Sequence, residues 1–130
     1  MKSFTVVEST PDNPKQKFTR HFVVRPQDLN HAGTAFCGTM MAHADEQAYI
    51  AATLSYPGCT FVTKLFSEFN FVRGAVEGDI VRIESEVLGK GRSSVRVAVT
   101  AVHAISGQEF FRTEAVLVNA REGRSVAIPE

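Results

Sequence analysis

A carboxylate stands in the middle of the most apolar stretch of the sequence. Asp45 lies within residues 38–58, where Ala, Met and Leu dominate, and its only strongly polar neighbours there are His43, Glu46 and Gln47. Burying an unpaired charge is costly, so such a carboxylate needs a partner, a water or a chemical task. Two interpretations stay open from the residue types alone. Residues 45–47 form a narrow solvated stripe, or Asp45 does chemistry.

The start of the same segment offers a second chemical group. Gly38 precedes Asp45 by two helical turns, which places both on one face of a helix at a separation of about 10 Å. The first N–H groups of a helix have no partner inside it and bind anions or a developing oxyanion. The N–H groups of Cys37, Gly38 and Thr39 would therefore polarise a bound carbonyl while Asp45 holds a water beside it. This is the arrangement that acyl transfer to water requires.

Other potentially reactive residues are weaker indications of a catalytic function. Asn30 and His31 precede the segment, where an asparagine either positions a water or forms a turn, the commoner use. We interpret Cys37 and Cys59 as unreactive thiols, because neither has a histidine at a fixed spacing. The histidines lack the spacing of metal ligands, and no GxSxG or GxxxxGK motif occurs. The sequence thus predicts no metal site, no covalent serine hydrolase and no P-loop enzyme.

Basic residues near two glycines give a further candidate site. Residues 89–94 have the sequence GKGRSS. Either the glycines form a hairpin turn with solvated charges at its tip, which is the commoner case, or the polar side chains contact the phosphates of a ligand. The candidates for phosphate contact are Lys90, Arg92, Ser93, Ser94 and, elsewhere in the chain, Arg73.

One small domain has to position these groups. Of the 130 residues, we assign 1–17 to an N-terminal extension, since residues 9–17 contain two prolines, an asparagine and an aspartate, and 18–130 to a single domain. A first strand is predicted over residues 18–24, and a structured loop follows it. Residues 38–58 predict one long helix that is mostly buried, because so few polar residues interrupt it. Its alanines either pack against a sheet or leave room for an aliphatic chain; they are Ala44, Ala48, Ala51 and Ala52.

The second half of the chain has a period of two, which is typical of strands. Over residues 61–71, one predicted face carries Phe61, Leu65, Phe69 and Phe71, and the other carries Lys64, Glu68 and Asn70. Three more strands are predicted over residues 79–88, 93–104 and 108–119, with short turns that make successive strands antiparallel neighbours. The expected fold class is α+β, an antiparallel five-stranded sheet wrapped around one long buried helix. Such a sheet covers one side of the helix, so we expect a second copy to pair with an edge strand or a helix flank.

Charge and composition exclude several classes of partner. The sequence has 14 basic and 14 acidic residues, so no overall positive field holds DNA or RNA. No stretch approaches the ~20 apolar residues that a membrane span needs. The first residues lack the apolar core of a signal peptide, and two unpaired cysteines fit a reducing compartment, so we expect a cytoplasmic location.

Several motifs, taken in order, resemble a known family. Residues 30–38 have the sequence NHAGTAFCG and precede Asp45. This is similar to the NxxGxxFGG motif and helical aspartate of the hot-dog acyl-CoA thioesterases, specifically their YciA-like and cytosolic acyl-CoA hydrolase branch. Three later segments match the family in the same order, residues 68–73, 76–81 and 91–95. The resemblance covers about residues 20–120, nearly the whole predicted domain.

The resemblance implies a hot-dog fold that hydrolyses acyl-CoA thioesters without a metal or another cofactor. It implies Asp45 as general base or nucleophile and the backbone N–H of Cys37 or Gly38 as the oxyanion donor. Asn30 would belong to the active site of the opposite subunit, because the implied assembly is a homodimer with sites at its interface that builds tetramers or hexamers. The residues implied along the coenzyme A channel are Arg92, Ser93 and Ser94.

Two positions depart from the family pattern. Cys37 replaces the first glycine of the helix start, and Gly74 replaces the proline that usually follows the residue at Arg73. If position 37 requires a positive φ, a cysteine there is strained and the oxyanion site is weakened; if only its N–H matters, cysteine serves equally well. Glu46 points about 100° away from Asp45 around a helix, so it cannot replace Asp45 without being re-aimed.

Two other hypotheses stand beside hydrolysis. Enoyl-CoA hydration on the same fold uses a DxNxxH motif, which residues 28–31 begin, but the histidine position is Gly33 here. A non-catalytic acyl-CoA binding module would explain Cys37 as a decayed oxyanion site, whereas the presence of Asp45 argues against it. We therefore favour the hydrolase.

Overall fold

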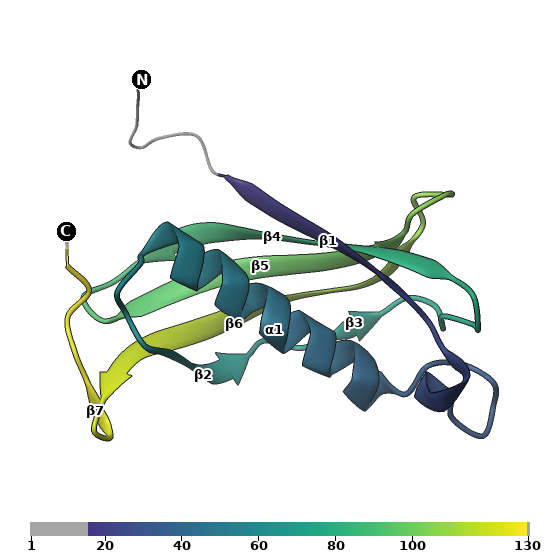
Figure 1. The fold of residues 1–130 in the computed structure, drawn as a ribbon, viewed down its shortest axis with the longest axis horizontal. Helices are drawn as coiled ribbons and strands as arrows, with labels where there is room; N and C mark the ends of the chain where they lie inside the picture. Colours follow the sequence, from purple (N-terminus) through teal and green to yellow (C-terminus); the bar gives the residue numbers. More distant parts are fainter. Residues whose placement is uncertain (1–15, 130) are drawn as a thin grey trace.

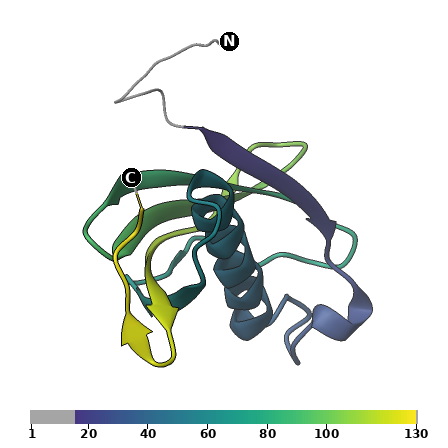
Figure 2. The ribbon, with the colours of Figure 1, turned by 60° about the vertical axis from the view of Figure 1, so that its left-hand side comes forward.

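A computed structural model describes residues 16–129; nearly all of the predicted N-terminal extension lies outside the described residues. Figures 1 and 2 show the long helix lying in the hollow of a curved sheet. In chain order the elements are β1 (Lys17–Val23), η1 (Pro26–Asp28), α1 (Cys37–Ser55), β2 (Phe61–Phe66), β3 (Asn70–Phe71), β4 (Ile80–Lys90), β5 (Ser94–His103), β6 (Glu109–Arg121) and β7 (Arg124–Ser125).

The main sheet is antiparallel and has the strand order β1-β4-β5-β6-β2, with β3 and β7 also paired to β6. The α+β class and the wrapped helix are confirmed. The predicted succession of four neighbouring strands is wrong in one respect, because β2 pairs with β6 and not with β4. Residues 72–79 form no hairpin. They run past the helix start, where the N–H of Ala35 donates to the carbonyl of Ala75 at 2.8 Å. Strands β1 and β2 are therefore the two edges of the order.

A bulge interrupts the predicted strand of residues 61–71. The register of β2 against β6 shifts between Thr63 and Leu65, and residues 67–69 belong to no strand. The prediction that Leu65 shares the face of Phe61 is wrong: Leu65 lies opposite Val116 on the outer face of the sheet. The extra residue, Lys64, is the cause, because one inserted residue inverts the alternation of all side chains that follow it.

Helix α1 packs on the inner face of the sheet through its smallest residues. The fully buried alanines of this contact are Ala44, Ala48, Ala51 and Ala52. Of the two interpretations of these alanines, packing is the one that the structure supports. On the flank toward β2, however, Met41, Asp45 and Tyr49 are exposed, so the prediction of a mostly buried helix is wrong for the single chain. No helix within residues 16–129 is long and apolar enough to cross a membrane.

A buried amide holds the opposite flank of α1 to edge strand β1. Gln47 is only 1% exposed. Its Nε2 donates to the carbonyl of Phe18 at 2.8 Å and to Ser85 Oγ at 3.2 Å, and its Oε1 accepts from Arg20 Nε at 3.2 Å. A buried amide with all these partners fixes the rotation of the helix, since any turn would leave a polar group unpaired. Arg20 also pairs with Glu46 at 3.4 Å, which gives Glu46 a role on this flank.

His43 lies on the same flank, with its ring stacked on Phe22 at 3.6 Å between centroids. Burial lowers the pKa of His43 from its ordinary value of 6.5, and the charge of Arg20 lowers it further. The carboxylates of Glu46 and Asp28 act in the opposite direction without cancelling the shift. The folded chain therefore favours the neutral imidazole.

Acid should weaken the folded state through His43. A base whose pKa is lower in the folded chain contributes stability that is complete above about pH 6.5 and is lost as the pH falls toward the folded pKa. Between about pH 7.5 and pH 5.5, we expect the melting temperature of the wild type to fall more than that of His43→Gln. Circular dichroism at constant ionic strength measures both slopes.

The matched control is His31→Gln, since His31 is exposed in the loop before α1. This variant should keep the wild-type slope of melting temperature against pH. Equal slopes for the wild type and His43→Gln would show that His43 does not couple protonation to folding.

Candidate active site

Asp45 lies where the exposed flank of α1 meets edge strand β2. The hydroxyl Oγ1 of Thr63 donates a hydrogen bond to Asp45 Oδ1 at 2.5 Å. Met41 and Tyr49 lie one helical turn before and after Asp45 on the same flank. Asp45 has no other hydrogen-bond partner among the described residues, so its second oxygen is available to a water or a substrate.

Thr63 is a candidate that the sequence analysis missed. It lies two residues after Phe61, shares the inner face of β2 with it, and lies opposite Leu117 of β6. The signal in the sequence was a hydroxyl on a predicted apolar face, where a polar group needs a partner. The partner of this hydroxyl could not be identified from the sequence, because Asp45 and Thr63 meet only when the helix packs against the sheet edge.

The first turn of α1 has no capping side chain. Phe36 is the N-cap residue and makes no side-chain hydrogen bond to the helix, although Ser, Thr, Asp or Asn is usual at that position. Nothing lies within 4 Å of the place where Gly38 would carry a Cβ. A hydrogen-bond acceptor from outside the chain therefore has room to approach the free backbone N–H groups of the first turn of α1.

Cys37 occupies the first position of α1 and is exposed. Within residues 16–129, Glu122 is the single residue other than glycine that has a positive φ. Cys37 thus adopts an ordinary backbone conformation, and the alternative in which cysteine strains this position does not hold. Its N–H is as well placed as that of a glycine.

Asn30 organises the turn that leads into the helix. Its Oδ1 accepts from the N–H of Ala32 at 2.8 Å and of Thr34 at 3.2 Å, and its Nδ2 donates to Thr34 Oγ1 at 3.2 Å. Gly33 completes the turn with a φ of 82°. The Asn30 side chain therefore stabilises the turn of residues 30–34. Among the described residues, no hydrogen bond joins it to Asp45.

A close approach explains the glycine that replaces proline after Arg73. A Cβ on Gly74 would lie 2.8 Å from Cγ2 of Thr34 and 2.9 Å from its Cβ, distances that real Cβ atoms do not tolerate. Gly74 thus lets residues 72–79 pass directly beside the turn that Asn30 organises.

The predicted phosphate contacts lie at opposite ends of the molecule. Arg73 follows β3 near the start of α1, with its guanidinium 5.9 Å from the ring centroid of Phe110. The other candidates surround the turn from β4 to β5, at the end where α1 finishes (Figure 1); they are Lys90, Arg92, Ser93 and Ser94. The 19 residues of α1 span about 28 Å. The structure does not bring the two sets together within one chain.

The sequence profile of the thioesterase superfamily matches residues 32–109. This chain belongs to the thioesterase superfamily. The match runs from the turn before α1 to the first residue of β6 and includes Asp45 and Thr63. The protein is therefore a thioester hydrolase. Among curated protein sequences, none matches this thioesterase significantly.

Solved structures similar to this thioesterase have the same architecture. The acyl-CoA hydrolase of Staphylococcus aureus, in complex with butyryl coenzyme A, coenzyme A and coenzyme A disulfide, is 30% identical with a TM-score of 0.77; 87% of this chain and 69% of that chain are covered. The acyl-CoA hydrolase of Bacillus cereus is 27% identical with a TM-score of 0.76 and coverages of 88% and 72%. A hexameric broad-specificity acyl-coenzyme A thioesterase is 28% identical with a TM-score of 0.75 and a coverage of 85% of each chain. The hot-dog fold is confirmed.

Gly74→Ala should disturb the turn of Asn30. The new methyl group has to displace the side chain of Thr34, and overpacking of this kind costs about 1–3 kcal/mol. We expect the free energy of unfolding in urea to fall by that amount and thioester hydrolysis to slow.

Gly89→Ala is the matched control, since a Cβ there meets only the end of Arg96 at 3.9 Å. It should change the free energy of unfolding by less than about 0.5 kcal/mol. If Gly74→Ala is as stable as this control, Thr34 does not require the glycine.

Proposed function

We propose that this thioesterase hydrolyses acyl-CoA, so that water and the thioester give a free carboxylic acid and coenzyme A. The observation that carries the proposal is the position of Asp45, held by Thr63, two turns from a helix N-terminus without a side-chain cap. The substrate class is supported by the similar structures, which are acyl-CoA hydrolases and thioesterases. The proposed reaction needs no metal or other cofactor.

The helix start serves the carbonyl oxygen of the thioester. In this proposal the N–H groups of Cys37 and Gly38 donate to that oxygen as it gains negative charge. These groups carry the partial positive charge of the helix N-terminus, so the stabilisation grows along the reaction.

Asp45 serves the carbonyl carbon. As a general base it takes a proton from a water, whose oxygen bonds to the carbon; the C–S bond then breaks, and the leaving thiolate receives the proton from Asp45. As a nucleophile, Asp45 would instead form a mixed anhydride with release of the thiolate, and water would hydrolyse that anhydride. In both routes Thr63 holds one carboxylate oxygen and leaves the other to react.

The residue types receive support from a similar enzyme. Solved structures of the Staphylococcus aureus hydrolase include variants with one aspartate, one asparagine or one threonine replaced by alanine. The replaced asparagine and aspartate are 15 residues apart, the same separation as between Asn30 and Asp45. In that enzyme the replaced threonine follows the asparagine and the aspartate in the chain, as Thr63 follows Asn30 and Asp45 here.

A homodimer would complete the site. Strand β2 is an unpaired edge, and the adjacent helix flank exposes large apolar side chains, Phe36, Met41 and Tyr49. A second copy related by a two-fold axis at this edge would cover that flank and remove Asp45 from bulk water, which strengthens every charge interaction there. Assembly beyond the dimer is supported by hexameric neighbours.

The same two-fold axis would unite the separated phosphate candidates. It runs the two α1 helices in opposite directions, so the Cys37 end of one helix lies beside the Ser55 end of the other. Arg73 of one subunit would then share a substrate channel with Lys90 and Arg92 of its partner. Asn30 would likewise serve the site of the opposite subunit.

Asp45→Asn should abolish most of the hydrolysis. The amide keeps the shape of the carboxylate but cannot act as a base, so we expect kcat to fall about 10²–10⁴-fold, whereas Thr63→Val should cost less. Free thiol release from acyl-CoA esters, acetyl to palmitoyl and one aromatic ester, measures the rate and identifies the preferred acyl group. Glu46→Gln is the matched control on the other flank and should keep the wild-type rate. An Asp45→Asn protein with wild-type turnover would refute the mechanism.

Mixed dimers test whether Asn30 and Asp45 of one site come from different subunits. We expect Asn30→Ala and Asp45→Asn each to be impaired as homodimers. After the two are unfolded together and refolded, a hybrid dimer would contain one wild-type site, and thiol release should recover to about a quarter of the wild-type value. No recovery, with hybrid dimers present by native mass spectrometry, would place both residues in one subunit's site.

A further inference from the structure

A bulge near the start of β6 changes the direction of one phenylalanine. Opposite β5, Phe111 pairs with Ala101, but the next pair joins Glu109 to Val102, so Phe110 is the extra residue. Phe110 and Phe111 are both 0% exposed, whereas a regular strand points successive side chains to opposite faces. Bulges re-aim side chains in this way and are over-represented next to active sites. The environment of the Phe110 ring is therefore a place to look for function.

Phe110 holds Arg73 through its backbone and through its ring. The carbonyl of Phe110 accepts a hydrogen bond from the N–H of Val72 at 2.8 Å, which fixes the chain directly before Arg73. The guanidinium of Arg73 lies 5.9 Å from the centroid of the Phe110 ring, within the range of a cation–π contact. Arginine in water has many rotamers, and fixing them on binding costs entropy. The two contacts reduce that cost before a ligand arrives.

The ring of His103 supports the same phenylalanine from β5. It packs against the Phe110 ring with 6.0 Å between centroids and 41° between planes. Two backbone N–H groups of the following turn donate to His103 Nδ1 at 3.2 and 3.3 Å, and its Nε2 lies 3.4 Å from Asp79 Oδ1. Asp79 also accepts from the N–H of Val76 at 2.9 Å. Because both nitrogens of His103 have partners, its ring keeps one orientation and so restrains that of Phe110.

Arg73 itself keeps its donors for a ligand. Its side chain is exposed, and within residues 16–129 it makes no salt bridge. A cation–π contact uses the face of the guanidinium, so the N–H groups at its edge still point outward and can bind two phosphate oxygens at once. Packing alone does not explain this arrangement, because a leucine would also fill an apolar site.

We propose that Phe110 is a positioning residue for substrate binding, which presents the Arg73 guanidinium in a fixed orientation to the phosphate groups of coenzyme A. His103 assists by restraining the ring. Phe110 touches no substrate and acts through Arg73 alone. The inference rests on the proposed function for the identity of the ligand.

Two thioesters of the same acid test the proposal, acyl-CoA and acyl-pantetheine, which lacks the phosphates of coenzyme A. The wild type should have the larger kcat/KM for acyl-CoA. Phe110→Leu keeps an apolar side chain but removes the aromatic face, so KM for acyl-CoA should rise about 2–5-fold with unchanged kcat. The kinetics with acyl-pantetheine should stay as in the wild type, which a general loss of structure would not allow.

Phe111→Leu is the matched control for the buried ring. Phe111 is the next residue of β6 and equally buried, but its ring contacts Phe69 and Phe71. This variant should keep the wild-type ratio of kcat/KM between the two esters, even if it is less stable.

Substitutions of Arg73 test the same contact from an exposed position. Arg73→Ala should reduce the preference for acyl-CoA at least as much as Phe110→Leu does. Arg73→Lys keeps the charge without the planar group and should lose part of the preference. The double variant of Arg73→Ala and Phe110→Leu should resemble Arg73→Ala, because Phe110 acts through Arg73. The variants of Arg73 alone decide the question even if Phe110→Leu fails to fold.

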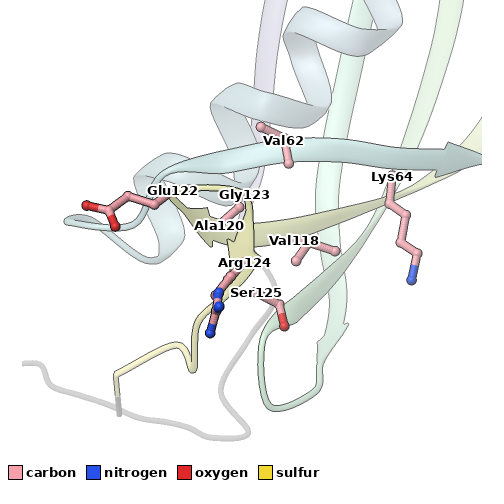
Figure 3. A pocket seen from close by; sticks show the side chains of 8 residues that line it. All are labelled: Val62, Lys64, Val118, Ala120, Glu122, Gly123, Arg124 and Ser125. Carbon is pink, nitrogen blue, oxygen red and sulfur yellow. The ribbon is translucent and has the colours of Figure 1, made fainter.

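Arg124→Ala is the matched control for the arginine. Arg124 is exposed on the hairpin between β6 and β7, where it lines a groove beside Val62 and Val118 on the outer face of the sheet (Figure 3). Its loss removes one positive charge, as Arg73→Ala does, and should leave the preference for acyl-CoA unchanged.

Equal kcat/KM for the two esters in the wild type would overturn the proposal, as would a wild-type preference in Phe110→Leu or Arg73→Lys. Additive losses in the double variant would overturn it as well, since Phe110 would then act by another route. A wild type that releases no thiol from either ester would instead refute the proposed function. Titration calorimetry with coenzyme A then tests the inference without turnover. The Kd should rise about 2–5-fold in Phe110→Leu and stay unchanged in Phe111→Leu; equal Kd values in both, or no binding to the wild type, would overturn it.

Discussion

Helix α1 must sit at one fixed rotation against the sheet, because its two flanks have different tasks. Buried alanines bring the helix close to the strands, and the amide of Gln47 joins it to β1 and β4. Rotation by one residue, about 100°, would take Asp45 away from Thr63 and would bury its carboxylate or leave it without a hydrogen-bond partner. The position of the proposed reactive flank thus depends on contacts made on the other side of the helix, where Arg20 and His43 lie.

The helix start departs from the family pattern at position 37. In the proposed reaction the oxyanion donor is a backbone N–H, so Cys37 can replace glycine as long as its φ stays negative, and it does. Gly74 is the reverse case. Its missing Cβ is what allows the passing chain to touch Thr34, and through Thr34 the turn of Asn30 keeps its shape.

One chain leaves several surfaces incomplete, and they all border β2. The strand has a free edge, the helix flank beside it exposes Met41 and Tyr49, and the outer face beneath it exposes Val62 and Leu65. Exposed apolar area of this extent around a single edge strand favours association over solvation. In the proposed dimer, a two-fold pairing would shield Asp45 and gather the phosphate candidates that one chain keeps apart.

The sequence by itself determined the elements that depend on local patterns. Helix residues 38–58 and the three long strands follow from periodicity and from Gly and Pro, and the observed elements start and end close to the predicted ones. Asp45 was identifiable as a candidate site residue because a charge in an apolar helix needs a partner, a water or a chemical task. Only the tertiary structure decided the rest: the bulge at Lys64, the pairing of β2 with β6, the partner of Asp45 in Thr63 and the separation of Arg73 from Arg92. Each of these depends on a contact between residues far apart in the chain, and such a contact leaves no local periodicity to read.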